Sequence, residues 1–478
     1  MRKWLLTLVC LLASTPGWGR VLLRWNQPSI PAAATLGFKD VVVSWDAEAL
    51  IRNARTQGYR VYAEVPAGKA AGMARSAGRS DLAGIVLNPG DSQPGQVAED
   101  LTQLRAAFPG VSVLVLDPKA KQPQMKGQLV VKRDGILQVT SPTAQPWIDS
   151  NLALIRLDQA FRPAQTPLYE FAWDLSDPQQ QETGPSPGDY ALAVAEAGAF
   201  RADLILDLYP SLLDGLSRHD PAARTVLNQI KRYLAFISGD KNAGAPEANV
   251  GVITDSYQKA YEPLNLFARH NIPFAVLRPS DLKPESLERF ALVVLFATPD
   301  EPTTTAIADF ASKGGTVVVV AAHGTYSWQS GPAVSQGENS LAYATGQGRI
   351  IELKGSVIDP ETFAQDIRRL LEEDRNKDKL AIGLWNALTV VAVPYRIRGS
   401  GDEIVELVNY AEEPISVQVQ VKGSFSSIRY ETPDRVCCDS LTPVQRGAFT
   451  EFVIPSLRIA ARVHLANGKL TKHKTEVK

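Results

Sequence analysis

The stretch DYALAVAEAGAFRADLILDLYP, residues 189–210, contains one complete helix–strand unit. Its first part, residues 189–200, has apolar residues at helical spacing, and residues 202–208 form an apolar run that carries Asp207 near its end. A strand that is apolar along nearly its whole length is typical of a buried parallel sheet. The stretch therefore predicts an α/β domain in which an acid lies at a strand terminus.

The same alternation of strand and helix extends back to residue 21. Segments predicted as strands lie at residues 21–25, 40–45, 59–65, 83–88, 111–117, 135–141, 167–173 and 202–208. Eight strands in roughly 220 residues fit a closed barrel. We therefore expect residues 20–240 to form a (β/α)8-like barrel, closed by an amphipathic helix at 222–236. Short connections, above all after Trp25, indicate an irregular barrel.

Two further units are predicted after the barrel. Residues 249–372 read as a doubly wound α/β domain with a polar surface loop at 327–347. Residues 380–466 change to short strands, several of alternating polarity, which favours a small antiparallel β-sandwich. The remaining residues, 467–478, form a polar tail. The overall class is α/β.

The N-terminus has the pattern of a secretory signal. Two basic residues precede an apolar run of about ten residues, which is too short to span a bilayer. We expect residues 1–19 to be removed and the mature chain to be secreted or periplasmic, without stable membrane insertion. The 478 residues carry a formal net charge of −1, which gives no support to nucleic-acid binding.

Four carboxylates end or nearly end predicted strands: Glu64, Asp117, Glu170 and Asp207. The strand C-termini of a (β/α) barrel open onto one face, where the active site lies. Such carboxylates suit general acid/base and nucleophilic chemistry on a sugar. The alternative is that each is paired with a basic or backbone group for structural reasons. Alternation along its strand allows Glu170 to face the barrel lumen.

Aromatic and polar residues follow the same strands. An indole at a barrel mouth can stack against a sugar ring, and it can equally cap the barrel core. The candidate substrate-binding residues are Trp25, Trp45, Asn88, Trp173, Asp174 and Tyr209.

The second unit has no signature of a cofactor or of thiol catalysis. Its first turn lacks G-x-G-x-x-G, and Ala297 occupies the place of a nucleophilic cysteine. No histidine spacing suits a metal, so we expect neither a metal nor a cofactor. Cys437 and Cys438 are two small residues in a sandwich loop or a vicinal disulfide.

The order of the three units resembles multidomain glycoside hydrolases, notably the β-galactosidases with a trimerisation domain. The resemblance is carried by EAGAFRADLILDL (196–208), IADFASKGGTVVVV (307–320) and the C-terminal stretches LVNYAEEPISVQVQV (407–421) and FVIPSLRIAARVHL (452–465). It implies an amidotransferase-like middle domain, a carbohydrate ligand and a homo-oligomer formed through that domain.

The resemblance also implies two catalytic glutamates. The acid/base Glu would follow an Asn at the end of the fourth strand, but Pro89 follows Asn88. The nucleophile would lie on the seventh strand, where Glu170 is the nearest match. Two hypotheses follow. One is a secreted glycoside hydrolase in which Glu170 is the nucleophile or base, Asp117 or Glu64 is the acid and Asp207 orients the substrate. The other is a non-catalytic carbohydrate-binding or scaffold protein.

Overall fold

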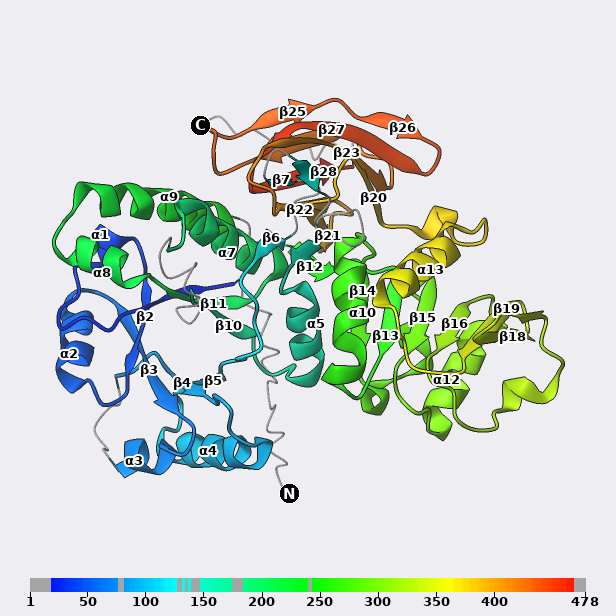
Figure 1. Ribbon diagram of the computed structural model, residues 1–478, viewed down its shortest axis with the longest axis horizontal. Coiled ribbons are helices and arrows are strands. Elements are labelled where there is room, and N and C mark those ends of the chain that lie inside the picture. Colours follow the sequence, from blue (N-terminus) through cyan, green and yellow to red (C-terminus); the bar gives the residue numbers. More distant parts are fainter. Residues whose placement is uncertain are drawn as a thin grey trace, which may run out of the picture.

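The computed structural model describes residues 19–75, 81–126, 131–133, 136–138, 147–173, 184–239 and 243–467. Figure 1 shows a parallel barrel in the first half of the chain, an α/β unit after it and a β-sandwich at the C-terminal end. The predicted signal peptide, apart from Gly19, and the tail from residue 468 lie outside the described residues. Among the helices that are described, none is long and apolar enough to cross a membrane.

The barrel is a seven-stranded parallel sheet in the order β10-β11-β1-β2-β3-β4-β5. A parallel bridge between Asp117 and Tyr169 joins its two edges, with the Asp117 amide donating to the Leu168 carbonyl at 2.8 Å. The strands are β1 (Val21–Arg24), β2 (Asp40–Ser44), β3 (Arg60–Pro66), β4 (Gly84–Asn88), β5 (Ser112–Val115), β10 (Leu168–Phe171) and β11 (Asp203–Asp207).

Helices follow most of these strands. They are α1 (Ala33–Leu36), α2 (Glu48–Thr56), α3 (Ala70–Arg75), α4 (Pro94–Ala107), α5 (Leu152–Phe161), α7 (Pro187–Phe200), α8 (Pro210–Ser217) and α9 (Pro221–Ile237). Helix α7 begins with a capping box between Ser186 and Asp189, which satisfies exposed amides at its first turn. It is apolar on nearly every side because it packs between the barrel, α9 and the sandwich.

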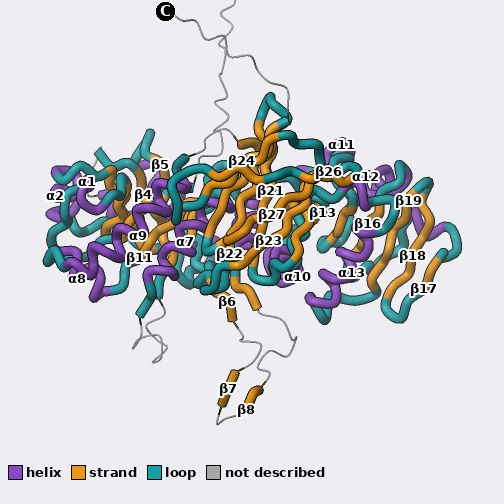
Figure 2. The backbone as a smooth tube through the Cα atoms, turned by 90° about the horizontal axis from the view of Figure 1, so that it is seen from above, coloured by secondary structure: helices purple, strands orange, loops and turns teal. Residues whose placement is uncertain are grey.

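The predicted strand at 135–141 is not part of the barrel. Its described residues form β8 (Ile136–Gln138), which pairs only with β7 (Val131–Arg133) in a two-stranded sheet. Figure 2 shows this hairpin projecting from the body of the molecule. A second small sheet joins β6 (Gln124–Lys126) to β9 (Trp147–Asp149). The four described strands between β5 and α5 therefore lie outside the barrel sheet.

The middle unit is a seven-stranded sheet in the order β14-β13-β15-β16-β19-β18-β17, parallel from β14 to β19. Its elements are β13 (Val250–Ile253), α10 (Tyr257–Arg269), β14 (Phe274–Leu277), α11 (Pro284–Leu287), β15 (Leu292–Leu295), α12 (Glu301–Ser312), β16 (Thr316–Val319), β17 (Ser335–Gln336), β18 (Ser340–Thr345), β19 (Gly348–Leu353) and α13 (Pro360–Glu372). The prediction of a surface loop over 327–347 was wrong, because β17 and β18 lie there and extend the sheet. Strand β18 pairs antiparallel with β19, and β17 pairs antiparallel with β18.

The C-terminal unit is a sandwich of two sheets. One has the order β12-β21-β22-β28-β24-β25 and the other β20-β23-β27-β26. The strands are β12 (Ala243–Pro246), β20 (Ile382–Trp385), β21 (Val390–Ile397), β22 (Glu403–Asn409), β23 (Ile415–Lys422), β24 (Ser427–Glu431), β25 (Asp439–Leu441), β26 (Val444–Arg446), β27 (Phe449–Leu457) and β28 (Ala460–Ala466). Strand β12 comes from the linker after α9, so the chain joins the sandwich before it enters the middle unit.

Candidate functional site

The barrel lumen contains one apolar layer that fixes the direction of the residues above it. The layer includes Leu22, Val42, Tyr62, Val86, Leu114, Leu116, Leu168 and Ile205. Because side chains alternate along a strand, the residue two positions further on points to the same side. At the C-terminal end of the lumen these residues are Arg24, Ser44, Glu64, Asn88, Glu170 and Asp207.

Arg24 binds three of the four predicted carboxylates. Its Nε and Nη2 donate to the two oxygens of Glu64 at 3.1 and 2.9 Å. Its Nη1 lies 2.6 Å from Oε2 of Glu170 and 3.2 Å from Oδ2 of Asp207. The structure thus brings together acids from β3, β10 and β11 around one guanidinium from β1.

The cluster is half-buried. The side chains of Arg24 and Glu64 are 17% and 16% exposed, and those of Glu170 and Asp207 are 28% and 30% exposed. Burial opposes the charge on Arg24, but the Glu64, Glu170 and Asp207 carboxylates more than offset it and raise its pKa. Burial raises the pKa of Asp207, and the Arg24 charge reverses only part of this effect. Asp207 therefore loses its proton at a higher pH than an ordinary aspartic acid does.

Asn88 belongs to the same cluster, whereas Asp117 does not. The amide of Asn88 donates to Oε1 of Glu64 at 2.8 Å, and its oxygen accepts from the Gly90 amide at 3.1 Å. Asp117 follows the lumen residue Leu116 and points away from the lumen. It pairs with Arg162 at 3.1 Å and with Lys119 at 3.3 Å. Asp117 is thus a separate ion pair outside the Arg24 cluster.

The opposite end of the lumen also carries charges, in a different arrangement. There Arg20 pairs with Asp203, and Arg60 pairs with Asp40 at 2.7 Å. Each acid has its own arginine, so this layer is balanced. At the mouth one arginine serves three acids, which leaves a net negative charge when all are ionised. Of these two layers, only the one at the mouth has more carboxylates than arginines.

The predicted aromatic residues differ in how they are placed. Trp25 is 1% exposed and donates from Nε1 to the Ser29 carbonyl at 2.8 Å, so its ring is a core element and cannot stack on a ligand. Trp45 follows β2 and lies over Gly72 of α3, and Trp173 follows β10 beside Phe171. Both, together with Tyr209 after β11, are half-buried near the strand ends. Asp174 lies outside the described residues.

Arg24 is the residue of the site that sequence reasoning missed. The signal was a single basic residue at the end of the apolar run VLLRW, residues 21–25. A buried cation requires carboxylate partners, and several strands of the same predicted barrel end in acids. Together these two features could have identified Arg24 as a candidate partner of the acids. Among the described residues, the metal-ligand grouping of three side chains is Glu431, Cys437 and Cys438, which lies in the sandwich rather than at the mouth.

A parallel barrel with acids at its mouth, followed by a doubly wound unit and a sandwich, is the architecture that the sequence resemblance implied. No protein-family model matches the sequence, and no curated protein matches it. Solved structures do match the fold. The α-L-fucosidase isoenzyme 2 from Paenibacillus thiaminolyticus aligns with 95% of this chain and 100% of its own, at 12% identity and a TM-score of 0.58.

A polyextremophilic β-galactosidase from the Antarctic haloarchaeon Halorubrum lacusprofundi is also similar. It aligns with 94% of this chain and 99% of its own, at 12% identity and a TM-score of 0.53. At this identity the likeness concerns the fold alone. The predicted resemblance to multidomain glycoside hydrolases and the α/β fold class are therefore confirmed, with seven strands in the barrel sheet.

Proposed function

We propose that the mouth of the barrel binds a carbohydrate and does not hydrolyse it. The observation that carries this proposal is the bonding of Glu64, Glu170 and Asp207 to the single guanidinium of Arg24. Glycoside hydrolysis requires one protonated carboxyl and one carboxylate that can attack or activate water. A bound cation occupies the carboxylate oxygens, so it works against both roles.

The same cluster suits the recognition of sugar hydroxyls. Its carboxylate oxygens accept hydrogen bonds, and the guanidinium and the Asn88 amide donate them. Hydrogen bonds to charged groups contribute roughly 1.5–3 kcal/mol each. The half-buried rings of Trp45, Trp173 and Tyr209 supply apolar faces for the C–H side of a pyranose. Polar groups in the lumen and aromatic rings near the strand ends together support a carbohydrate ligand.

Hydrolysis is the second candidate, and one observation favours it. The burial that raises the pKa of Asp207 suits a general acid, and Glu170 is the partially exposed carboxylate beside it on the neighbouring strand. In this alternative, Arg24 would have to move away from Glu170 when substrate binds. The same strand-end acids would then be catalytic rather than binding groups.

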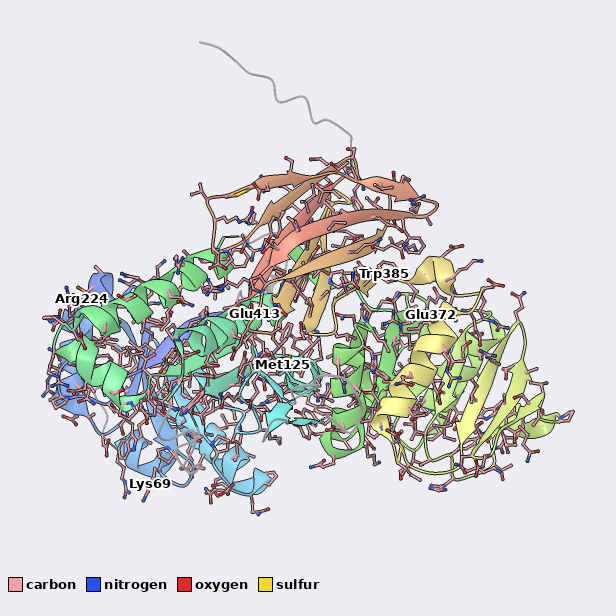
Figure 3. All side chains as sticks on the ribbon, turned by 45° about the horizontal axis from the view of Figure 1, so that its top comes forward. Lys69, Met125, Arg224, Glu372, Trp385 and Glu413 are labelled. Carbon is pink, nitrogen blue, oxygen red and sulfur yellow. A yellow bond between two sulfur atoms is a disulfide. The ribbon has the colours of Figure 1, made fainter. Side chains whose placement is uncertain are left out.

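A panel of oligosaccharides and aryl-glycosides tests the proposal on the mature chain. We expect at least one sugar to raise the thermal midpoint, and Trp45→Ala and Glu170→Gln each to weaken its binding about tenfold, which corresponds to about 1.4 kcal/mol. No aryl-glycoside should be turned over. Matched controls are Trp385→Ala, on β20 of the sandwich (Figure 3), and Glu288→Gln, an exposed acid paired with Lys313. Turnover that Glu170→Gln abolishes would favour the hydrolase.

We further propose that the protein acts outside the cytoplasm, following the predicted signal at residues 1–19. Its homo-oligomerisation and the amidotransferase-like character of residues 249–372 also stay predictions. Cell fractionation and N-terminal sequencing of the secreted chain test the location. Sedimentation of the mature protein tests the homo-oligomerisation.

A further inference from the structure

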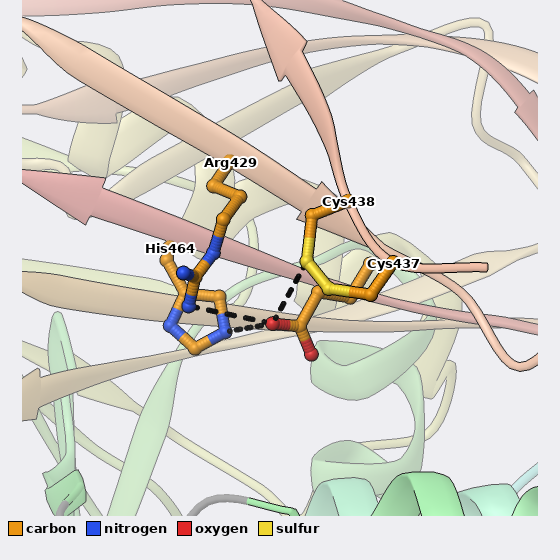
Figure 4. The surroundings of a disulfide bond; sticks show 5 residues. Arg429, Cys437, Cys438 and His464 are labelled. Carbon is orange, nitrogen blue, oxygen red and sulfur yellow. Dashed lines mark hydrogen bonds and ion pairs between the residues drawn. A yellow bond between two sulfur atoms is a disulfide. The ribbon is translucent and has the colours of Figure 1, made fainter.

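The loop between β24 and β25 places two sulfur atoms beside a carboxylate and an imidazole. Cys437 and Cys438 are joined as a vicinal disulfide just before β25, and Glu431 ends β24. Strand β28 pairs with β24 in a register that sets His464 opposite Arg429, so that His464 and Glu431 share one face of the sheet. Figure 4 shows Arg429, His464 and the Cys438 sulfur converging on a single carboxylate oxygen, which belongs to Glu431.

The separations of the Glu431 carboxylate from His464 and from Cys438 are close to those between ligands of a small metal ion. Oε1 of Glu431 lies 3.1 Å from Nε2 of His464 and 3.6 Å from Sγ of Cys438. Both sulfur atoms and a Glu431 oxygen lie within 4.8 Å of one another. Ligands around tetrahedral zinc, at bond lengths of about 2.0–2.3 Å, are about 3.5 Å apart. His464 lies outside this group of three, so the imidazole has to move toward the sulfur atoms, and reduction has to separate the two sulfurs, before the four groups surround one ion.

We propose that the reduced form of this loop binds Zn²⁺ through Cys437, Cys438, Glu431 and His464. Two thiolates, an imidazole and a carboxylate are all common zinc ligands, and four of them complete a tetrahedral site. Sequence spacing did not reveal the site, because strand pairing and not proximity in the chain delivers His464. The inference is independent of the function proposed for the barrel.

Arg429 is the group that opposes a cation here. Its Nη2 lies 3.4 Å from Oε1 of Glu431, but its side chain is 55% exposed and can turn into solvent. Two thiolates and one carboxylate carry three negative charges, so the zinc-bound site keeps one negative charge. Arg429 at the rim then balances that charge, and its presence is compatible with binding.

Binding requires a reducing step that the position of the cysteines permits. Cys437 is exposed and Cys438 is half-buried, so a small dithiol reaches them. The dithiol's two S–H bonds become one S–S bond, and the Cys437–Cys438 bond becomes two S–H groups. Zn²⁺ then replaces both thiol protons, and the two protons go to solvent.

The loop that carries the site also contacts a helix of the barrel. Asp434, in the same loop, accepts a hydrogen bond from the hydroxyl of Tyr233 on α9 at 3.3 Å. An ion held by the loop and by β28 restrains the segment that carries this contact. Zinc binding is therefore also expected to protect the loop from proteolysis.

The test uses the full mature chain without a polyhistidine tag, reduced with dithiothreitol and then freed of reductant under nitrogen. Zn²⁺ is titrated against a chromophoric chelator, and Co²⁺ reports the geometry through its visible bands. We expect one ion per reduced chain, none per oxidised chain and thiolate-to-cobalt charge transfer. His464→Gln should weaken binding at least tenfold, whereas His323→Gln, at an exposed position of the middle unit, should not.

Three results overturn the proposal. One is unchanged zinc binding by the Cys437→Ser, Cys438→Ser double variant, which would place the ion elsewhere. Another is the absence of binding by reduced protein whose circular dichroism shows an intact fold. The third is equal binding by oxidised and reduced chains, which would contradict the role of the thiols.

Discussion

Arg24 determines the chemistry of the barrel mouth at the scale of single residues. Its three carboxylate partners come from β3, β10 and β11, and it alone supplies their counter-charge within the cluster. The acids themselves could be predicted, because each lies at or next to the end of an apolar strand. Arg24 could not be assigned to them, since two of its partners lie 40 and 183 positions away in the chain. Only closure of the barrel brings them together.

Replacement of Arg24 by Met leaves half-buried carboxylates without a partner. Removing one member of a buried ion pair typically costs about 3–5 kcal/mol, and water reaching these partly exposed groups reduces this to about 2 kcal/mol. We expect urea denaturation to show that loss in the free energy of unfolding. Arg278→Met, which removes an exposed pair with Asp281, should change stability by less than about 0.5 kcal/mol. Equal effects of the two variants would mean that the cluster is solvated.

At the scale of elements, most helices and barrel strands can be predicted from the sequence. The apolar spacing predicts helices α2, α4, α7, α9, α10, α12 and α13. The seven barrel strands follow from their apolar runs. The error at 135–141 arose because a short apolar run does not specify its partner, and here the partner is β7 instead of a barrel strand. The strand β17 was missed because it is a polar edge strand of two residues, and β18 was missed because it lies within the same polar, Gly-rich stretch.

Two glycine-to-alanine substitutions, one at the contact between α7 and α9 and one away from it, test how closely these helices pack. A Cβ at Gly198 would lie 2.4 Å from Cγ2 of Ile237, so Gly198→Ala forces the two helices apart. Overpacking of this kind costs about 1–3 kcal/mol. Gly95→Ala in α4 meets nothing within 4 Å and should be neutral or stabilising by up to about 1 kcal/mol. Thermal unfolding of both variants measures the difference, and a neutral Gly198→Ala would contradict the close packing.

At the scale of the whole molecule, Glu196 connects the barrel to the sandwich. It lies in α7 and is fully buried. Oε1 accepts from the Asn151 amide at 2.7 Å, and Oε2 accepts from the Tyr410 hydroxyl at 2.6 Å. Burial raises its pKa from 4.5 to about 7, although these hydrogen bonds oppose the shift. No pattern in the sequence identified this contact, since it depends on how the units pack.

The raised pKa makes the contact sensitive to pH. Between about pH 4.5 and pH 7 the folded protein keeps the Glu196 proton while the unfolded chain releases it, so stability falls as pH rises through this window. A shift of this size corresponds to about 3 kcal/mol. The free energy of unfolding of wild type minus that of Glu196→Gln should fall by a few kcal/mol from pH 4 to pH 8. A flat profile for Glu196→Gln would refute the assignment.

Native mass spectrometry of the mature chain with intact oligosaccharides tests the central claim most directly, because one spectrum reports both binding and cleavage. The account predicts a complex whose mass equals that of the protein plus the uncut sugar, stable over hours of incubation and weakened by Trp45→Ala. Shortened sugars that accumulate with wild type and are absent with Glu170→Gln would contradict it, and would show that the strand-end carboxylates catalyse hydrolysis despite Arg24.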